Sequence, residues 1–96
     1  MKDKERKVVP VTVVESLDKE YNVERTEELK AFTTEPAYVT YKEGVTISLG
    51  NYESSRLDYG VTIPCEIADI EATTIEAITR VKGVLKERVT VIKGLV

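Results

Sequence analysis

The stretch VTISLGNYESSRLDYGVTIPC, Val45 to Cys65, decides the fold, because apolar and polar residues alternate on both sides of a short polar segment. Before that segment, Val45, Ile47 and Leu49 point to one face of a strand. After it, a second apolar face is shared by Leu57, Tyr59, Val61, Ile63 and Cys65. Two strands of matching pattern joined by a short polar link predict an antiparallel β-hairpin.

The polar segment between the two strands is GNYESSR, residues 50–56. Gly50 and Asn51 favour a turn because both tolerate a positive φ. We expect a hairpin loop somewhat longer than the shortest kind. A turn explains the small polar residues, but it does not explain Tyr52, a large aromatic residue close to Arg56. A contact surface is therefore a second interpretation of the same residues.

A helical period replaces the strand period between Asp69 and Val89. One half of the helical wheel holds the apolar side chains, which are Ile70, Ile75, Ala77, Ile78, Val81, Val84, Leu85 and Val89. This pattern predicts an amphipathic helix lying on a sheet. Asp69 is one candidate cap, and Thr73 with Glu76 has the capping-box spacing of a later start. The stretch VTVIKGLV, residues 89–96, predicts either a final edge strand or a frayed end.

The amino-terminal part is less regular. Residues 7–14 are rich in Val and Thr and predict a strand, in which Pro10 favours an edge position or a late start. Residues 15–35 carry seven acidic and three basic side chains, and they predict a loosely structured arm or one short helix capped by Thr26. Residues 38–49 predict another strand, with a bulge or bend at Gly44.

These elements predict a single α+β domain over residues 1–96. We expect a small antiparallel sheet of three or four strands with one long amphipathic helix packed on one face. Residues 37–96 form the hairpin and helix core of this prediction. Residues 1–36 are a partly extended arm that contains the amino-terminal strand.

The composition is that of a folded cytoplasmic protein. Hydrophobic residues make up 42% of the chain and charged residues 32%, and the net charge is −3. One cysteine and no histidine leave no internal disulfide and no zinc-site spacing, so we expect neither metal nor cofactor. The apolar run near the amino end is too short for a membrane helix. Gln, His and Trp are absent while Glu, Lys, Arg, Val and Ile are plentiful, a bias typical of thermophiles.

The sequence favours a protein that is not an enzyme. Without histidine, acid–base chemistry near neutral pH requires a carboxylate or lysine with a strongly shifted pKa. The pair Ser54 and Ser55 lacks a nucleophile context, and Cys65 lacks a histidine to activate it, so we expect Cys65 to be buried packing. The acidic residues just before the helix are expected to interact with the helix dipole rather than to bind a cation; they are Glu66, Asp69 and Glu71.

Aromatic and basic side chains gather on or beside the predicted hairpin. Single-stranded nucleic acid is bound on sheet surfaces by aromatic stacking beside basic groups. The candidate nucleic-acid-binding residues are Tyr38, Tyr41, Lys42, Tyr52 and Arg56. A regular strand places Tyr38, Thr40 and Lys42 on one face. The structural alternative is that the tyrosines merely half-cover a small sheet, and the acidic net charge favours it.

A third interpretation is an oligomeric protein-binding module. One helix covers only one face of a small sheet, and edge strands invite pairing with another copy. We expect a homodimer or ring closed through an edge strand at Val8–Val14 or through the helix. The acidic segment 15–35 suits a basic surface on a protein partner.

The order of motifs also resembles a known group of proteins. A strand ending in LGNYES, a second alternating strand, a PC pair and a long amphipathic helix resemble small uncharacterised proteins of bacteriophages and other mobile elements. The resemblance covers Tyr41 to Val89. It implies a phage or viral accessory protein of DNA metabolism in the host cytoplasm, and it assigns no catalytic residue. The leading hypothesis is thus a protein that binds single-stranded nucleic acid or assists proteins that do. The competing one is a module of virion assembly or host-factor inhibition.

Overall fold

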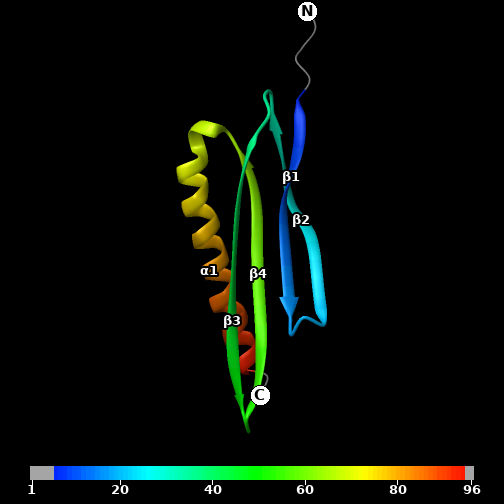
Figure 1. Cartoon of the computed structure of the whole chain (residues 1–96), viewed down its shortest axis with the longest axis vertical. Coiled ribbons are helices and arrows are strands. Elements are labelled where there is room, and N and C mark those ends of the chain that lie inside the picture. The colour runs from blue at the N-terminus through cyan, green and yellow to red at the C-terminus, as the bar shows by residue number, and fades with distance from the viewer. Residues whose placement is uncertain (1–5, 95–96) are drawn as a thin grey trace, which may run out of the picture.

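A computed structural model describes residues 6–94, which form a four-stranded antiparallel sheet with one long helix on one face (Figure 1). This architecture confirms the predicted α+β class. The strands are β1 (Lys7–Leu17), β2 (Tyr21–Phe32), β3 (Ala37–Gly50) and β4 (Glu53–Cys65). A short 3-10 turn, Ile67–Asp69, leads into α1 (Ile70–Gly94).

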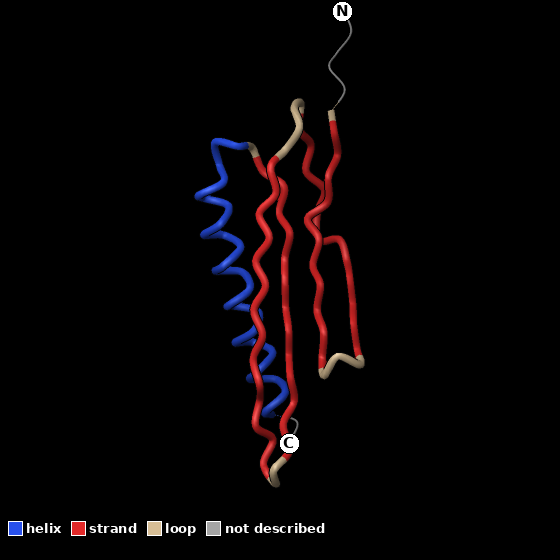
Figure 2. Tube along the Cα trace, viewed as in Figure 1, coloured by secondary structure: helices blue, strands red, loops and turns tan. Residues whose placement is uncertain are grey.

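The sheet consists of two hairpins joined side by side in the order β2-β1-β4-β3. The joint between them is short, because β1 pairs with β4 only from Thr12 to Leu17, opposite Thr62 to Leu57. Figure 2 shows that the tight turns of both hairpins lie toward the same end of the molecule. The backbone pairing that holds the two hairpins in one sheet is therefore concentrated toward that end.

The hydrophobic core lies between the sheet and α1. The helix contributes a stripe of buried side chains at every fourth position, namely Thr73, Ala77, Val81 and Leu85. The sheet contributes alternate residues of three strands, which are Val11, Val13, Val39, Ile47, Leu57, Tyr59, Val61, Ile63 and Cys65. The alternation predicted for the central hairpin is confirmed, and Cys65 is buried as expected.

Ion pairs flank the apolar stripe of α1 on both sides. Glu15 of β1 accepts from Arg88 at 3.1 Å and from Arg25 at 3.4 Å. Glu43 of β3 accepts from Lys82 at 2.9 Å. Each pair is partly exposed and contributes at most about 1 kcal/mol. The buried stripe therefore supplies most of the stability of the helix–sheet contact, and the pairs set its orientation.

The prediction for residues 15–35 is wrong, because most of that segment is the strand β2 rather than an arm or a helix capped by Thr26. The reason is that β1 has backbone N–H and C=O groups along its whole length that need partners, and the following segment pairs with all of it. The outer edge of β2 faces solvent, where charged side chains are favoured because they discourage pairing with other chains. Residues 1–36 therefore do not form a separate arm where the structure describes them. The stretch Val8–Val14 is an edge strand only before Thr12, because from Thr12 onward β1 pairs with β4 as well as with β2.

Several smaller predictions also differ from the structure. The helix continues to Gly94 instead of giving way to a strand at residue 89, and Thr73 is buried inside it rather than capping it. Gly44 lies in a regular ladder, and the register of the central hairpin shifts between Ser48 and Gly50. Pro10 lies in the part of β1 that has left β4, which agrees with the expected edge-like environment.

Two glycines allow a matched test of this backbone. Gly83 lies inside α1, where an added Cβ would meet nothing within 4 Å, so Gly83→Ala should stabilise the fold by about 0.5–1 kcal/mol. Gly50 is equally open but has a φ of +86°, so Gly50→Ala should destabilise it by about 1 kcal/mol. Urea unfolding measures both variants. A stabilising Gly50→Ala change would contradict the turn geometry, and a destabilising Gly83→Ala change would contradict the helix.

Candidate nucleic-acid interface

The face of the sheet opposite α1 is called the open face, because no element of the described chain covers it (Figure 1). Three of the predicted binding residues, Tyr38, Lys42 and Arg56, lie on this face. Tyr38 stands opposite Pro64 and is 53% exposed, and Lys42 stands opposite Gly60. The structure therefore confirms the expected shared face of Tyr38, Thr40 and Lys42, and Arg56 joins it from β4.

Two glycines shape this face by leaving out side chains. A Cβ on Gly44 would overlap the ends of the Arg56 and Asp58 side chains, which lie over it. A Cβ on Gly60 would stand 3.3 Å from the Cβ and Cγ of Lys42. Arg56 and the stem of Lys42 consequently lie low along the sheet. The Arg56 guanidinium donates to Asp58 at 3.3 Å.

A row of threonines crosses the open face on all four strands. The paired residues in order are Thr26, Thr12, Thr62 and Thr40. The hydroxyls of Thr40 and Thr62 lie 3.0 Å apart and share a hydrogen bond. Such cross-strand pairs stabilise a sheet, and the same hydroxyls are donors and acceptors of the kind that contact phosphate and sugar.

The turn between β3 and β4 presents Tyr52 at the tip of the molecule. Its central residues, Asn51 and Tyr52, have φ of 51° and 63°, as in the tight turns that suit hairpins. The loop is therefore as short as hairpin loops commonly are, not longer as predicted, and Glu53 already belongs to β4. Positive φ is unfavourable for a residue with a bulky side chain, and the Tyr52 side chain is fully exposed. No packing contact offsets that conformation.

The turn between β1 and β2 is fastened to β4 by Asp18. The Asp18 carboxylate accepts from the Ser55 hydroxyl at 2.7 Å and from the Arg56 backbone N–H at 2.6 Å. The Asp18 N–H in turn donates to the Arg56 carbonyl at 2.7 Å. Ser55 therefore has a structural role. These hydrogen bonds, the Ser55 hydroxyl first, hold the pKa of Asp18 below its ordinary value.

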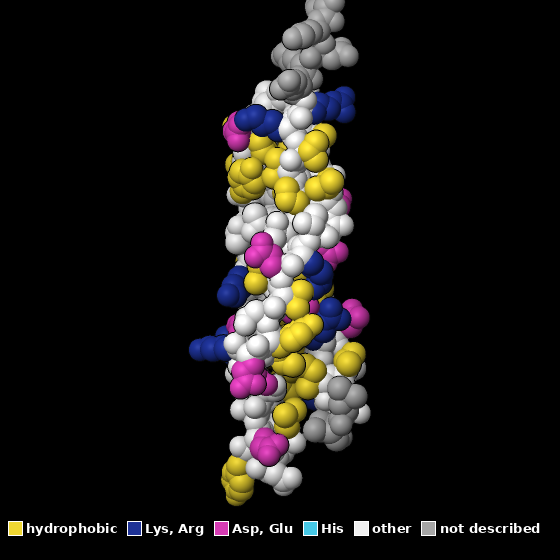
Figure 3. Space-filling model, turned by 90° about the vertical axis from the view of Figure 1, so that its right-hand side faces the viewer, with side chains coloured by type: hydrophobic (Ala, Val, Ile, Leu, Met, Phe, Trp, Pro, Cys, Tyr) yellow, Lys and Arg dark blue, Asp and Glu magenta, His cyan; other side chains and the backbone are white. Residues whose placement is uncertain are grey.

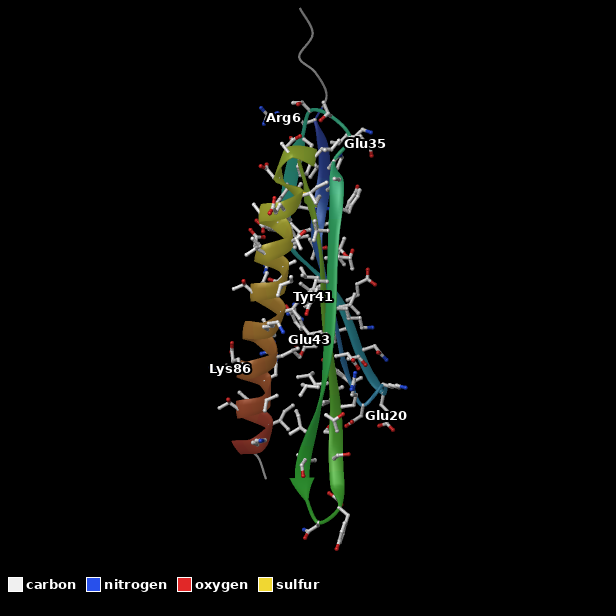
Figure 4. All side chains as sticks on the ribbon, turned by 60° about the vertical axis from the view of Figure 1, so that its left-hand side comes forward. Arg6, Glu20, Glu35, Tyr41, Glu43 and Lys86 are labelled. Carbon is white, nitrogen blue, oxygen red and sulfur yellow. The ribbon has the colours of Figure 1, made fainter. Side chains whose placement is uncertain are left out.

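Tyr41 is separated from the other candidates, because it lies on the helix side of the sheet. Figure 4 shows Tyr41 and Glu43 between β3 and α1. The Tyr41 hydroxyl donates to Glu43 at 2.7 Å, which raises the pKa of the phenol and, together with Lys82, lowers the pKa of Glu43. Tyr41 thus belongs to the contact between sheet and helix.

Lysine and arginine side chains alternate with acidic ones over the side of the molecule shown in Figure 3. Hydrophobic side chains gather toward its upper part and along its lower half. A long-range positive field is therefore not a property of this side. Any anion that binds there is selected by local groups.

Three polar residues near Arg56 were missed because they lie in the segment predicted to be an arm. They are Ser16, Lys19 and Asn22, and β1 and β2 bring them to the open face beside Asp58. Asp18 and Lys19 have φ of 54° and 61°, and Asn22 donates to the Lys19 carbonyl at 3.1 Å. The turn sequence LDKE followed by the alternating YNVER was the signal for a hairpin at this place.

Among residues 6–94, no three histidine, cysteine or acidic side chains gather closely enough to hold a metal ion. Over the same stretch, no helix combines the length and hydrophobicity needed to cross a lipid bilayer. No protein-family model, curated protein or solved structure was found to match this chain. Function is therefore inferred from the open face and the hairpin tip.

The Asp18 contact predicts a pH dependence of stability. The folded pKa of Asp18 lies below its ordinary value of 3.8, so its contribution is complete above 3.8 and is lost as the pH falls through the folded pKa. Asn adopts the same positive φ as Asp but lacks the charge, so the Asp18→Asn variant should have a lower free energy of unfolding than the parent at neutral pH. This difference in free energy should shrink in acid. Urea unfolding at neutral and at acid pH measures the difference, and a value independent of pH would contradict the role of the ionised carboxylate.

Proposed function

We propose that this protein is a non-enzymatic binding protein whose open face and hairpin tip contact single-stranded nucleic acid. In keeping with the resemblance of its central motifs, we place it among phage or viral accessory proteins. The observation that carries the proposal is the conformation and exposure of Tyr52, in the turn at one end of the hairpin that carries Tyr38, Lys42 and Arg56.

The Tyr52 conformation works against folding. Left-handed backbone is unfavourable for L-residues with side chains, and Gly or Asn is the usual occupant of such a position. A fully exposed aromatic ring gains nothing from the core in exchange. Unfavourable backbone that packing does not explain is a reason to infer a binding role.

These aromatic and basic side chains have the composition of a surface that binds single-stranded nucleic acid. They run along β3 and β4 from Tyr38 through Lys42 to Arg56, and the turn with Tyr52 follows at the end of the two strands. The 14 residues of β3 span about 45 Å. Exposed tyrosine rings supply stacking surfaces for bases, and the two cations supply contacts for the phosphates between them. The threonine row adds neutral hydrogen-bonding groups to the same face.

The acidic net charge limits the expected strength of this binding. A chain of charge −3 gains little from long-range attraction of a polyanion. Stacking at the two tyrosines therefore carries more of the affinity than the cations do. We expect modest affinity, a measurable loss with added salt, and a preference for single strands because bases in a duplex are not free to stack.

The Tyr52→Gly variant separates the effect of Tyr52 on the stability of the fold from its effect on nucleic-acid binding. The variant should raise Tm by roughly 4–8 °C, because it removes a side chain from left-handed backbone in a small domain. It should also weaken binding of a labelled single-stranded oligonucleotide by about 5- to 150-fold, the range for the loss of one stacked base. Fluorescence anisotropy at two salt concentrations measures binding, and a thermal melt measures stability.

Two tyrosines outside the open face serve as controls. Tyr21 is exposed at the start of β2, and Tyr41 lies against α1, so Tyr21→Thr and Tyr41→Phe should leave oligonucleotide affinity unchanged. Tyr38→Thr should weaken it as Tyr52→Gly does. Absence of binding by the parent protein at high micromolar concentration would overturn the proposal, and so would equal losses in the control variants.

A second candidate is the oligomeric protein-binding module, and the free outer edge of β2 favours it. The acidic segment proposed for the contact lies largely on that edge. Its charges discourage pairing with most chains, but a strand with complementary charges can pair there. Light scattering across a range of protein concentrations distinguishes the candidates. A stable oligomer that ignores oligonucleotides supports the second candidate, and a monomer at all concentrations removes its homo-oligomeric form.

A further inference from the structure

A hollow in the open face lies where the two hairpins meet. Its volume is about 690 Å³, which is within the range of sites that hold small molecules or parts of larger ones. Residues from β1, β2, β3, β4 and the β1–β2 turn surround it, and they are Val14, Ser16, Lys19, Asn22, Lys42, Arg56 and Asp58.

The hollow is locally positive in a chain that is negative overall. Lys19, Lys42 and Arg56 face a single carboxylate, that of Asp58. Arg56 shares that carboxylate at 3.3 Å. Lys19 and Lys42 form no ion pair with any residue between positions 6 and 94. Two cationic groups are therefore left for an anion from outside the chain.

Separate structural elements hold the three cations around the opening. Asp18 ties the β1–β2 turn to the backbone of Arg56 by two hydrogen bonds, and this places the neighbouring Lys19 beside β4. Asn22 donates to the Lys19 carbonyl and so fixes the turn from the other strand. The missing side chain at Gly60 makes room for the stem of Lys42. The backbone positions that carry these side chains are thus fixed before binding, which lowers part of the entropic cost.

We infer that this hollow binds a phosphate group, with Lys19, Lys42 and Arg56 as its cationic partners and Asp58 as the opposing charge. A phosphate offers several acceptor oxygens to cations that approach from different sides, and such charge-assisted hydrogen bonds are the strong ones. The inference deepens the proposed function if the group is a phosphodiester of a bound strand. It stands independently if the group belongs to a phosphorylated small molecule.

Inorganic pyrophosphate is the probe for the hollow, and isothermal titration calorimetry at low salt measures its binding to the full chain. Lys19→Gln and Lys42→Gln should each weaken pyrophosphate binding by roughly tenfold or more, the loss of one charge-assisted hydrogen bond. Asp58→Asn should tighten it because the repelling charge is gone. Lys86→Gln removes an equal charge from the far side of α1 and should change nothing (Figure 4).

An oligonucleotide titration of the same variants distinguishes a phosphate of a bound strand from the phosphate of a small molecule. If Lys19→Gln weakens both pyrophosphate and single-stranded DNA, the hollow holds a phosphate of the strand. If the parent binds pyrophosphate but no oligonucleotide, the hollow inference holds for a small phosphorylated ligand and the proposed function fails. If the parent binds oligonucleotide while Lys19→Gln and Asp58→Asn leave that affinity unchanged and no pyrophosphate binds, the inference is overturned and the proposed function remains. Thermal melts check that each variant is folded.

Discussion

The short pairing between β1 and β4 is the constraint on which the rest of the structure depends. Each hairpin satisfies its own inner backbone groups, but only the ladder from Thr12 to Leu17 joins the hairpins into one sheet. The Asp18 carboxylate extends that ladder beyond the end of β1 by accepting from Ser55 and Arg56. Without this joint, Val11 and Val13 would lose their place in the core beneath α1.

The same joint creates the surface to which we assign function. It brings Lys19 from one hairpin beside Arg56 and Lys42 of the other. It also aligns threonines on all four strands in one row. Because α1 packs only on the opposite face, this surface stays free. Gly44 and Gly60 have no side chains on this surface, so Arg56 and the stem of Lys42 lie close against the backbone of the sheet. Fold and candidate site are thus consequences of one arrangement.

Much of this was predictable from local pattern. The period of two in Val45–Cys65 and the period of 3.6 after Asp69 each indicate a buried face, and the buried Ala77, Val81 and Leu85 lie on the predicted side of α1. Two residues of the predicted apolar face, Ile70 and Ile75, are exposed, because the stripe that contacts the sheet is narrower than half of the helical wheel. The strand β2 was harder to predict, because only its first residues, Tyr21 to Arg25, alternate, and the rest of this solvent-exposed edge strand has no apolar period. Its formation depends on the backbone needs of β1, which is information from another part of the chain.

The residues of the candidate site likewise fall into those that local pattern predicts and those that depend on strand pairing. Tyr38 and Lys42 were placed on one face by strand alternation alone, and the register of the central hairpin adds Arg56. Tyr41 is a neighbour of Lys42 in the sequence, but its odd position in the strand turns it toward α1. Ser16, Lys19 and Asn22 were missed because their position depends on pairing between segments far apart in the chain. Pattern predicts which residues share a strand face, and only topology predicts which strands meet.

Residue-resolved NMR of the labelled protein, titrated with a short single-stranded oligonucleotide, tests most directly whether the open face binds nucleic acid. We predict that the largest changes in backbone amide shifts cluster on the open face and at the turn, around Tyr38, Lys42, Tyr52 and Arg56. Amides of α1 on the far side should move little. Changes confined to α1 or to the outer edge of β2, or no changes at all, would contradict the proposed binding surface.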